Sequence, residues 1–217
     1  MVRLLLQCRA NKDRGTRCAG ETPLCIAAQE GHVDVTQLLL TSSAKIDQGT
    51  TQDGATPLFR AASNGHLEVV RSLMKSKANK DQAKTDDGAT PLFTAAEAGH
   101  LEVVRLLVLS GANIDQATTD FGATPLFIAS YRGHLEIVQC LLESNGHVDR
   151  ATVDDGTTPV LVAADYGRLE IVRLLVRFRA NTDQGRIDDG ATPLFVAAQK
   201  GHLEVVQFLV LSASQDR

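Results

Sequence analysis

The sequence repeats itself with a period of 34 residues, and no other feature constrains the fold as strongly. A Thr-Pro-Leu motif, or Thr-Pro-Val in one case, starts at six evenly spaced positions: Thr22, Thr56, Thr90, Thr124, Thr158 and Thr192. Three further series keep the same step, namely an Asp, a turn Gly, and a Gly that is followed by His or, once, by Arg. A period of about 20–50 residues is typical of solenoids, in which each repeat packs against its neighbours only.

The sequence of each repeat predicts two short helices and a polar loop. In the second full repeat, a turn at Asp53-Gly54 precedes Thr56, whose hydroxyl is typical of a helix N-cap. Pro57 then occupies the first helical position, and Gly65 ends the helix in the left-handed conformation. Residues 67–74 place apolar side chains three and four positions apart, as an amphipathic second helix does. Both helices are shorter than the about 12–15 residues that make an isolated helix marginally stable, so stacking must stabilise them.

The segment at residues 86–107 reads DDGATPLFTAAEAGHLEVVRLL and closely resembles the ankyrin repeat. Tetratricopeptide repeats share the 34-residue period, but they carry a Pro near the end of the second helix, whereas here the Pro opens the first helix. The resemblance extends over essentially the whole chain. It implies an all-α ankyrin-repeat solenoid of helix–turn–helix units, each with a β-hairpin-like finger.

The resemblance also sets the expected domain organisation. We expect a single domain at residues 1–217, with a half repeat at residues 1–14 and six full repeats whose motifs start at residues 22, 56, 90, 124, 158 and 192. The chain begins inside a second helix and ends without a polar capping repeat, which solenoids need. The sequence therefore predicts a segment of a longer repeat array.

The repeats depart from the family pattern in two places. The His that follows Thr-Pro-Leu in the family is replaced, so we expect apolar packing where this His bridges repeats. Its replacements are Cys25, Phe59, Phe93, Phe127, Leu161 and Phe195. The family's Gly after the second helix survives only as Gly111, and we expect the other residues in that slot to adopt positive φ at some cost. Those residues are Arg9, Ser43, Lys77, Asn145 and Arg179.

Composition and charge exclude several classes of function. With a net charge of −4 and a pI of 5.8, the chain lacks the basic excess that binding nucleic-acid phosphates requires. No run approaches the about 20 apolar residues of a membrane helix, and the first residues form no signal peptide. The cysteines show no CxxC spacing, which indicates reduced thiols and not a disulfide framework or a zinc site. The sequence therefore predicts an intracellular, cytoplasmic protein that binds neither nucleic acid nor membrane.

The sequence gives no positive sign of catalysis, so we expect no enzyme, no metal and no small-molecule cofactor. One His per repeat recurs at the start of the second helix: His32, His66, His100, His134 and His202. Packed repeats lie about 8–10 Å apart, which is too far for two of these side chains to share a zinc ion. We predict instead that they form hydrogen-bonded junctions between helices. Paired Asp residues before the turn Gly are explained by turn chemistry.

Positions that vary between nearly identical repeats are free to serve a partner. They are the two residues before each turn Gly and the two after each Ala-Ala pair, and in ankyrin-like domains they line the concave face. The resemblance therefore implies a protein–protein interaction module or scaffold that binds a partner protein there. Two alternatives stay open: a structural spacer segment of a longer repeat array, without a dedicated binding site, and the regulatory part of an enzyme whose catalytic domain lies outside this segment.

The partner-binding residues that we predict are aromatic or charged and lie in two neighbouring repeats: Phe121, Tyr131, Arg132, Asp165 and Tyr166. Aromatic and Arg side chains are enriched at the energetic centres of interfaces. We expect the two tyrosines to flank one partner side chain. In the alternative interpretation, Phe121 packs onto the next finger and the tyrosines only cover alanines, and a binding site elsewhere in the groove would involve Arg60 and Asn64.

Overall fold

The computed structural model of the chain describes residues 11–213, so most of the predicted half repeat at residues 1–14 lies outside the described residues. Contacts divide the chain into two compact parts, Met1–Asn113 and Ile114–Arg217, referred to below as the N-terminal half and the C-terminal half. Each half is described by itself, and the single domain over residues 1–217 stays a prediction.

Every regular element within residues 11–213 is an α-helix. The helices of the N-terminal half are α2 (Pro23–Gln29), α3 (Val33–Thr41), α4 (Pro57–Ser63), α5 (Leu67–Lys75), α6 (Pro91–Ala98) and α7 (Leu101–Leu109). Those of the C-terminal half are α8 (Pro125–Arg132), α9 (Leu135–Glu143), α10 (Pro159–Asp165), α11 (Leu169–Arg177), α12 (Pro193–Lys200) and α13 (Leu203–Ala213).

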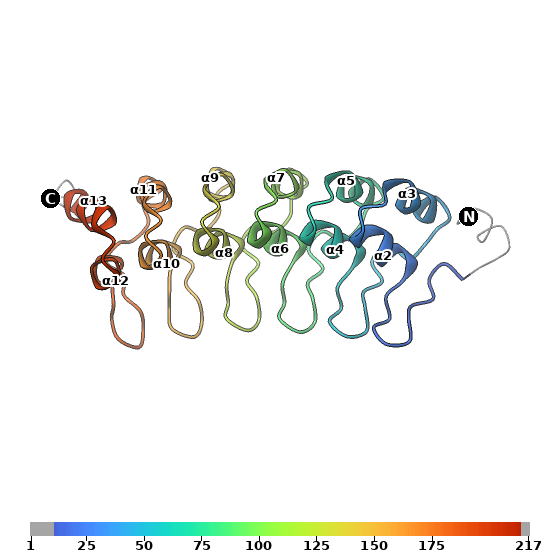
Figure 1. The fold of residues 1–217 in the computed structure, drawn as a ribbon, viewed down its shortest axis with the longest axis horizontal. Coiled ribbons are helices and arrows are strands. Elements are labelled where there is room, and N and C mark those ends of the chain that lie inside the picture. The colour runs from blue at the N-terminus through green and yellow to red at the C-terminus, as the bar shows by residue number, and fades with distance from the viewer. Residues whose placement is uncertain (1–10, 214–217) are drawn as a thin grey trace. The chain divides into compact units, whose positions relative to one another are not determined.

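Within each half, the helices form two rows. The first helices of successive repeats pack on each other, α2 on α4 and α4 on α6, and likewise α8 on α10 and α10 on α12. The second helices form the other row, and each also packs against the first helix of its own repeat. In each half of Figure 1, the loops between repeats project beyond the row of first helices. The all-α solenoid architecture predicted from the repeats is confirmed.

Each first helix begins with the same cap. The hydroxyl of Thr56 accepts a hydrogen bond from the backbone N–H of Phe59 at 3.2 Å, and Pro57 occupies the first turn. The same cap occurs at Thr22, Thr90, Thr124, Thr158 and Thr192. A cap of this kind stabilises a helix by about 1 kcal/mol. The predicted helix starts are therefore confirmed in every full repeat.

The core of each half is a thin layer between the two rows of helices. It consists of Leu, Val and Ile from both helices of a repeat and of alanine pairs such as Ala61-Ala62, which are fully buried and let first helices approach closely. Phe59 and Phe93 are buried, so apolar packing does replace the family's His at these positions. The expectation is wrong at Phe195, which is 55% exposed, and at Cys25. The buried thiol donates a hydrogen bond to the carbonyl oxygen of Gln48 at 3.4 Å, so a polar bridge to the next loop survives there.

The loops form the predicted fingers, but without β-strands in the described residues. In the finger of the second full repeat, the N–H of Thr50 donates to the carbonyl of Ala55 at 3.1 Å, and Gly54, at φ 70°, makes the turn. One backbone hydrogen bond then links each finger to the previous one where both lie in the same half, as between the N–H of Thr85 and the carbonyl of Asp53 at 2.8 Å. So few bonds per finger are too short a ladder to count as a strand.

Histidine and aspartate side chains tie successive repeats together. Nε2 of His66 lies 2.8 Å from the carbonyl oxygen of Gln29 in the preceding repeat, and His100 and His202 make equivalent bonds at 3.1 Å and 2.9 Å. The predicted hydrogen-bonded junction is confirmed at these three residues. The Asp series also links successive repeats, a role that sequence reasoning did not assign. A carboxylate oxygen of each such Asp accepts a hydrogen bond from the backbone N–H 32 positions later. The N–H of Asn79, for example, donates to Asp47 at 2.9 Å.

The slot after the second helix has positive φ whether or not it holds Gly. Gly111 has φ 76°, and the equivalent Ser43, Lys77, Asn145 and Arg179 have φ between 61° and 66°. The prediction for these four residues is confirmed, while Arg9 lies outside the described residues. The left-handed region costs an L-residue about 1–2 kcal/mol, so the stack holds these side chains in a strained backbone conformation.

Candidate functional site

The predicted tyrosines lie where first helices of the C-terminal half end. Tyr131 is the penultimate residue of α8, and Tyr166 is the C-cap of α10. The small residues before them, such as the Ala163-Ala164 pair, are fully buried between neighbouring helices. The buried pair directs the residues that follow it away from the core. Tyr166 is accordingly 46% exposed, while Tyr131 is half-buried.

The two tyrosines contact each other directly. Their ring centroids are 4.8 Å apart at an interplanar angle of 78°, which is an edge-to-face aromatic pair. The guanidinium of Arg132 lies over the Tyr131 ring, 5.3 Å from its centroid. The expectation that the tyrosines flank a partner side chain is therefore wrong, because the rings fill the space between them. A partner can reach only the outer surface of the pair.

The surroundings of Tyr166 keep its phenol neutral. Interaction with the Tyr131 side chain, and then burial, raises the pKa of the Tyr166 hydroxyl above its ordinary value, and the charge of Asp165 adds to the shift. Asp165 is the last residue of α10, and its carbonyl oxygen accepts the hydrogen bond from His202. The backbone of Asp165 thus ties the next repeat down while its half-buried side chain adds negative charge beside the tyrosines.

Phe121 lies on a finger of the C-terminal half and is 57% exposed, so it is not packed away under the next finger. Its carbonyl oxygen accepts the N–H of Val153 at 2.9 Å. Most other fingers carry Asp at this position. In one of them, Asp155 accepts hydrogen bonds from the Thr152 hydroxyl and the Thr157 N–H at 2.8 and 2.9 Å. Phe121 makes no such turn bond, and it offers an exposed aromatic surface instead.

Sequence reasoning missed two exposed apolar residues on the two fingers that follow the finger of Phe121. Val153 and Ile187 are 70% and 77% exposed. They lie three residues before the turn Gly, one position before the two variable residues that precede it. The signal was present in the sequence, because the equivalent residues of the N-terminal half are Thr51 and Thr85.

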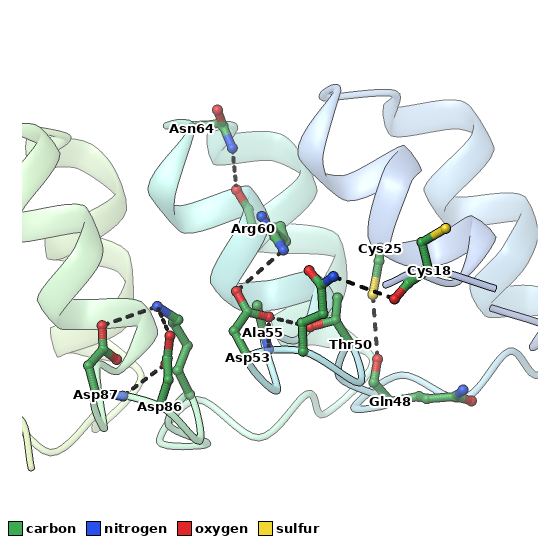
Figure 2. A network of polar contacts seen from close by, with 12 residues as sticks. Cys18, Cys25, Gln48, Thr50, Asp53, Ala55, Arg60, Asn64, Asp86 and Asp87 are labelled. Carbon is green, nitrogen blue, oxygen red and sulfur yellow. Dashed lines mark hydrogen bonds and ion pairs between the residues drawn. The ribbon is translucent and has the colours of Figure 1, made fainter. Parts of the chain in front are cut away.

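The corresponding surface of the N-terminal half is polar and paired. Figure 2 shows Arg60 reaching Asp53, with an N–O distance of 3.5 Å, and Asn64 donating to the Arg60 carbonyl at 2.9 Å. Lys84 contacts Asp86 and Asp87 at 3.2 and 3.1 Å. These ion pairs satisfy the charges of the fingers within the protein itself.

One finger carboxylate in each half, Asp53 and Asp155, is held in its ionised form. Burial alone would raise the pKa of Asp53, but hydrogen bonds from Thr50 and from the Ala55 N–H, with the charges of Arg60 and Lys84, lower it below its ordinary value. At Asp155, too, burial alone would raise the pKa. Hydrogen bonds with Thr157 and Thr152 outweigh burial and lower the pKa below its ordinary value. The carboxylates of Asp53 and Asp155, one in each half, therefore remain negative at neutral pH.

In the part of the chain that the structure describes, no three His, Cys, Asp or Glu side chains gather closely enough to hold a metal ion. Across residues 11–213 the helices are too short or too polar for any of them to span a bilayer.

A comparison with protein families assigns these repeats. The family model for ankyrin repeats matches residues 1–86, 78–152 and 144–216. The chain belongs to the ankyrin repeat family. A search of curated proteins found no match. Ankyrin repeats are generally protein–protein interaction modules, and the family is typically non-enzymatic.

Proposed function

We propose that this ankyrin-repeat chain is an interaction module that binds a partner protein through the concave face of its C-terminal half. The binding residues are Phe121, Tyr131, Arg132, Asp165 and Tyr166. The observation that supports this most is the edge-to-face pair of the half-buried Tyr131 and the exposed Tyr166. The N-terminal half offers Ser63 and Asn64 in the equivalent positions of its second full repeat.

The geometry of the pair suits a hot spot. Each tyrosine holds its neighbour in place and Arg132 lies over one ring, so little side-chain entropy remains to be lost on binding. Aromatic and Arg side chains together supply apolar area, hydrogen-bond donors and charge. The opposite charges of Arg132 and Asp165 would fix the orientation of a partner more than they add to its affinity.

A matched pair of double variants tests this proposal. Tyr131→Ala with Tyr166→Ala is expected to cost at least about 2 kcal/mol of affinity for a purified partner, or about 30-fold in Kd. Ser63→Ala with Asn64→Ala, the control, should change Kd less than about twofold. Isothermal titration calorimetry gives both values, and circular dichroism checks the fold. Undiminished binding by the tyrosine variant, together with loss in an Arg60→Ala, Asn64→Ala variant, would place the site in the N-terminal half.

The alternative function is a structural spacer within a longer repeat array. The near-identity of the repeats favours it, since specialised repeats diverge. A spacer has no saturable partner, so the wild-type chain and the tyrosine variant would then both fail to show saturable binding. Saturable binding that depends on the tyrosines excludes the spacer.

We further infer a cytoplasmic, non-enzymatic protein that needs no metal or cofactor. The thiols of Cys18 and Cys25 form no disulfide, which suits a reducing compartment. Chelator treatment should leave the melting temperature unchanged, and a fall of several degrees that zinc reverses would contradict the inference.

A further inference from the structure

We propose that the finger tips of the C-terminal half recognise an extended partner segment with apolar side chains three residues apart and Lys or Arg between them. This surface, the finger ledge, consists of Phe121, Val153 and Ile187 with the neighbouring Asp154 and Asp188. The inference rests on the proposed function, because it names the partner chemistry that the same half selects.

The three apolar residues lie on adjacent fingers. The N–H of Val153 bonds to the carbonyl of Phe121, and the N–H of Ile187 bonds to the carbonyl of Asp155 in the finger that carries Val153. All three side chains are more than half exposed. Single exposed apolar residues are common on protein surfaces, but three on consecutive fingers form a patch, which indicates an interaction site.

Packing within the fold does not require these side chains to be apolar. The Val153 side chain covers the turn at Gly122, because a Cβ added to Gly122 would lie only 2.7 Å from Cγ1 of Val153. In the N-terminal half, Cγ2 of Thr85 covers Gly54 with the same distance of 2.7 Å. A threonine therefore fits the finger as well as a valine does. At 70% exposure, replacing a hydroxyl by a methyl adds apolar surface in contact with water, which favours binding and not folding.

Phe121 is likewise not needed to form its turn. At the equivalent position, Asp53 accepts the N–H of Ala55 at 3.1 Å and Asp189 accepts that of Ala191 at 2.9 Å. In the finger of Phe121, the Thr118 hydroxyl accepts the N–H of Ala123 instead, at 3.1 Å. The turn forms without an Asp, and the aromatic ring adds exposed area in its place.

The charges around the ledge favour a cationic partner. Four acidic side chains lie on the fingers that carry Val153 and Ile187, against one basic side chain, Arg186: Asp154, Asp155, Asp188 and Asp189. Arg186 contacts Asp189 at 2.6 Å and Asp188 at 3.9 Å. Asp154 is exposed and has no ion pair with a described residue. In the N-terminal half, by contrast, Lys84 and Arg60 neutralise the finger carboxylates. On the fingers of the ledge, Arg186 balances only one of the four negative charges, and the remaining excess of negative charge attracts and orients Lys and Arg side chains.

The spacing of the fingers selects the register of the partner. Packed helices lie about 8–10 Å apart, and each finger belongs to one repeat. An extended polyproline II segment rises about 9 Å over three residues and returns to the same face. One apolar side chain in every three then reaches one finger, and the residues between them face the carboxylates.

The test uses the full chain and a displayed library of random 12-residue peptides. The wild-type chain should enrich peptides that have apolar residues at every third position and Lys or Arg between them. The ledge variant, Phe121→Asp with Val153→Thr and Ile187→Thr, restores the residue types of the N-terminal half and should bind the enriched peptides at least about tenfold more weakly. Val153→Thr alone provides a milder second variant, and thermal unfolding confirms that both fold.

The other outcomes overturn the inference in distinguishable ways. Enriched peptides without this spacing or charge, or peptides whose binding needs Tyr131 and Tyr166 but not the ledge, would refute the ledge and leave the proposed function standing. Failure to enrich any peptide would refute the ledge, and the calorimetric test of the tyrosines would then decide the proposed function alone. A dimer of the wild-type chain in sedimentation velocity that the ledge variant abolishes would make the ledge a contact between copies.

Discussion

The two halves of the molecule share one fold but present different surfaces. Both stack three helix pairs with the same Thr caps and the same leucine core. The N-terminal half closes its fingers with ion pairs such as Arg60 with Asp53, whereas the C-terminal half exposes Phe121 and the tyrosine pair. The difference shows that the buried residues which pack the repeats together and the exposed residues which form the surface occupy separate positions of the repeat. The exposed positions can then change without affecting the fold.

The ion pairs of the N-terminal half are not themselves evidence of a more stable half. Arg60 and Asp53 are each about a quarter exposed, and pairs near the surface contribute about 0–1 kcal/mol. Their main effect is on recognition, because charges that are satisfied internally attract a partner less strongly.

The largest expected effect tests whether the cores of the two halves are packed in the same way. Leu73→Ala and Leu175→Ala remove fully buried side chains from the same position of α5 and α11. Each should cost about 2–5 kcal/mol of unfolding free energy, because each leaves a cavity. Chemical denaturation measures both. Costs that differ by more than about 2 kcal/mol would mean that the halves are not packed alike.

Much of the fold was predictable because its determinants are local. The Thr caps, the Pro at the first helical position and the turn Gly at φ near 70° each follow from short-range hydrogen bonds or backbone sterics. The positive φ of Lys77 and Arg179 followed from comparing repeats at a slot where the family has Gly. No interaction with distant residues was needed for any of these predictions.

The candidate site was less predictable because it depends on side-chain positions across repeats. The sequence placed Tyr131 and Tyr166 in neighbouring repeats, but not in contact with each other. The tyrosines occupy different positions after the alanine pair, and this diagonal offset brings the rings together. The hydrogen bond from the Cys25 thiol could not be predicted for a similar reason, since its acceptor is a backbone carbonyl 23 residues away.

The second prediction concerns a variant that removes the difference between the halves at one finger. Phe121→Asp should raise the unfolding free energy by about 0.5–1.5 kcal/mol, because Asp supplies the turn hydrogen bond that other fingers make. The same variant should weaken partner binding. Thermal unfolding and titration of one sample measure both effects. A loss of stability would show that the phenylalanine supports the fold.

A third prediction concerns strain that both halves share. Lys77→Gly and Arg179→Gly should each raise the unfolding free energy by about 0.5–1 kcal/mol, because Gly adopts positive φ without a Cβ clash. Gly111→Ala, at φ 76°, should do the opposite and serves as the control. Denaturation midpoints give the comparison, and destabilisation by both Gly variants would argue against strain at this slot.

The smallest expected effect depends on pH. The folded state lowers the pKa of both Asp53 and Asp155, so their contribution to stability is complete above the unfolded value of about 3.9 and is lost as pH falls through the folded value. Asp53→Asn should therefore flatten the loss of stability below about pH 5 by a few tenths of a kcal/mol. Added salt should reduce this difference for Asp53, which pairs with Arg60. An unchanged acid profile in urea titrations would contradict the assignment.

The central claim is that partners bind the C-terminal half, and hydrogen exchange of a partner complex tests it most directly. We predict slower amide exchange on binding in residues 119–132 and 153–166. The equivalent residues 51–64 and 85–98 of the N-terminal half should exchange as in the free chain. Protection confined to the N-terminal segments, with none around Tyr131 and Tyr166, would contradict the account.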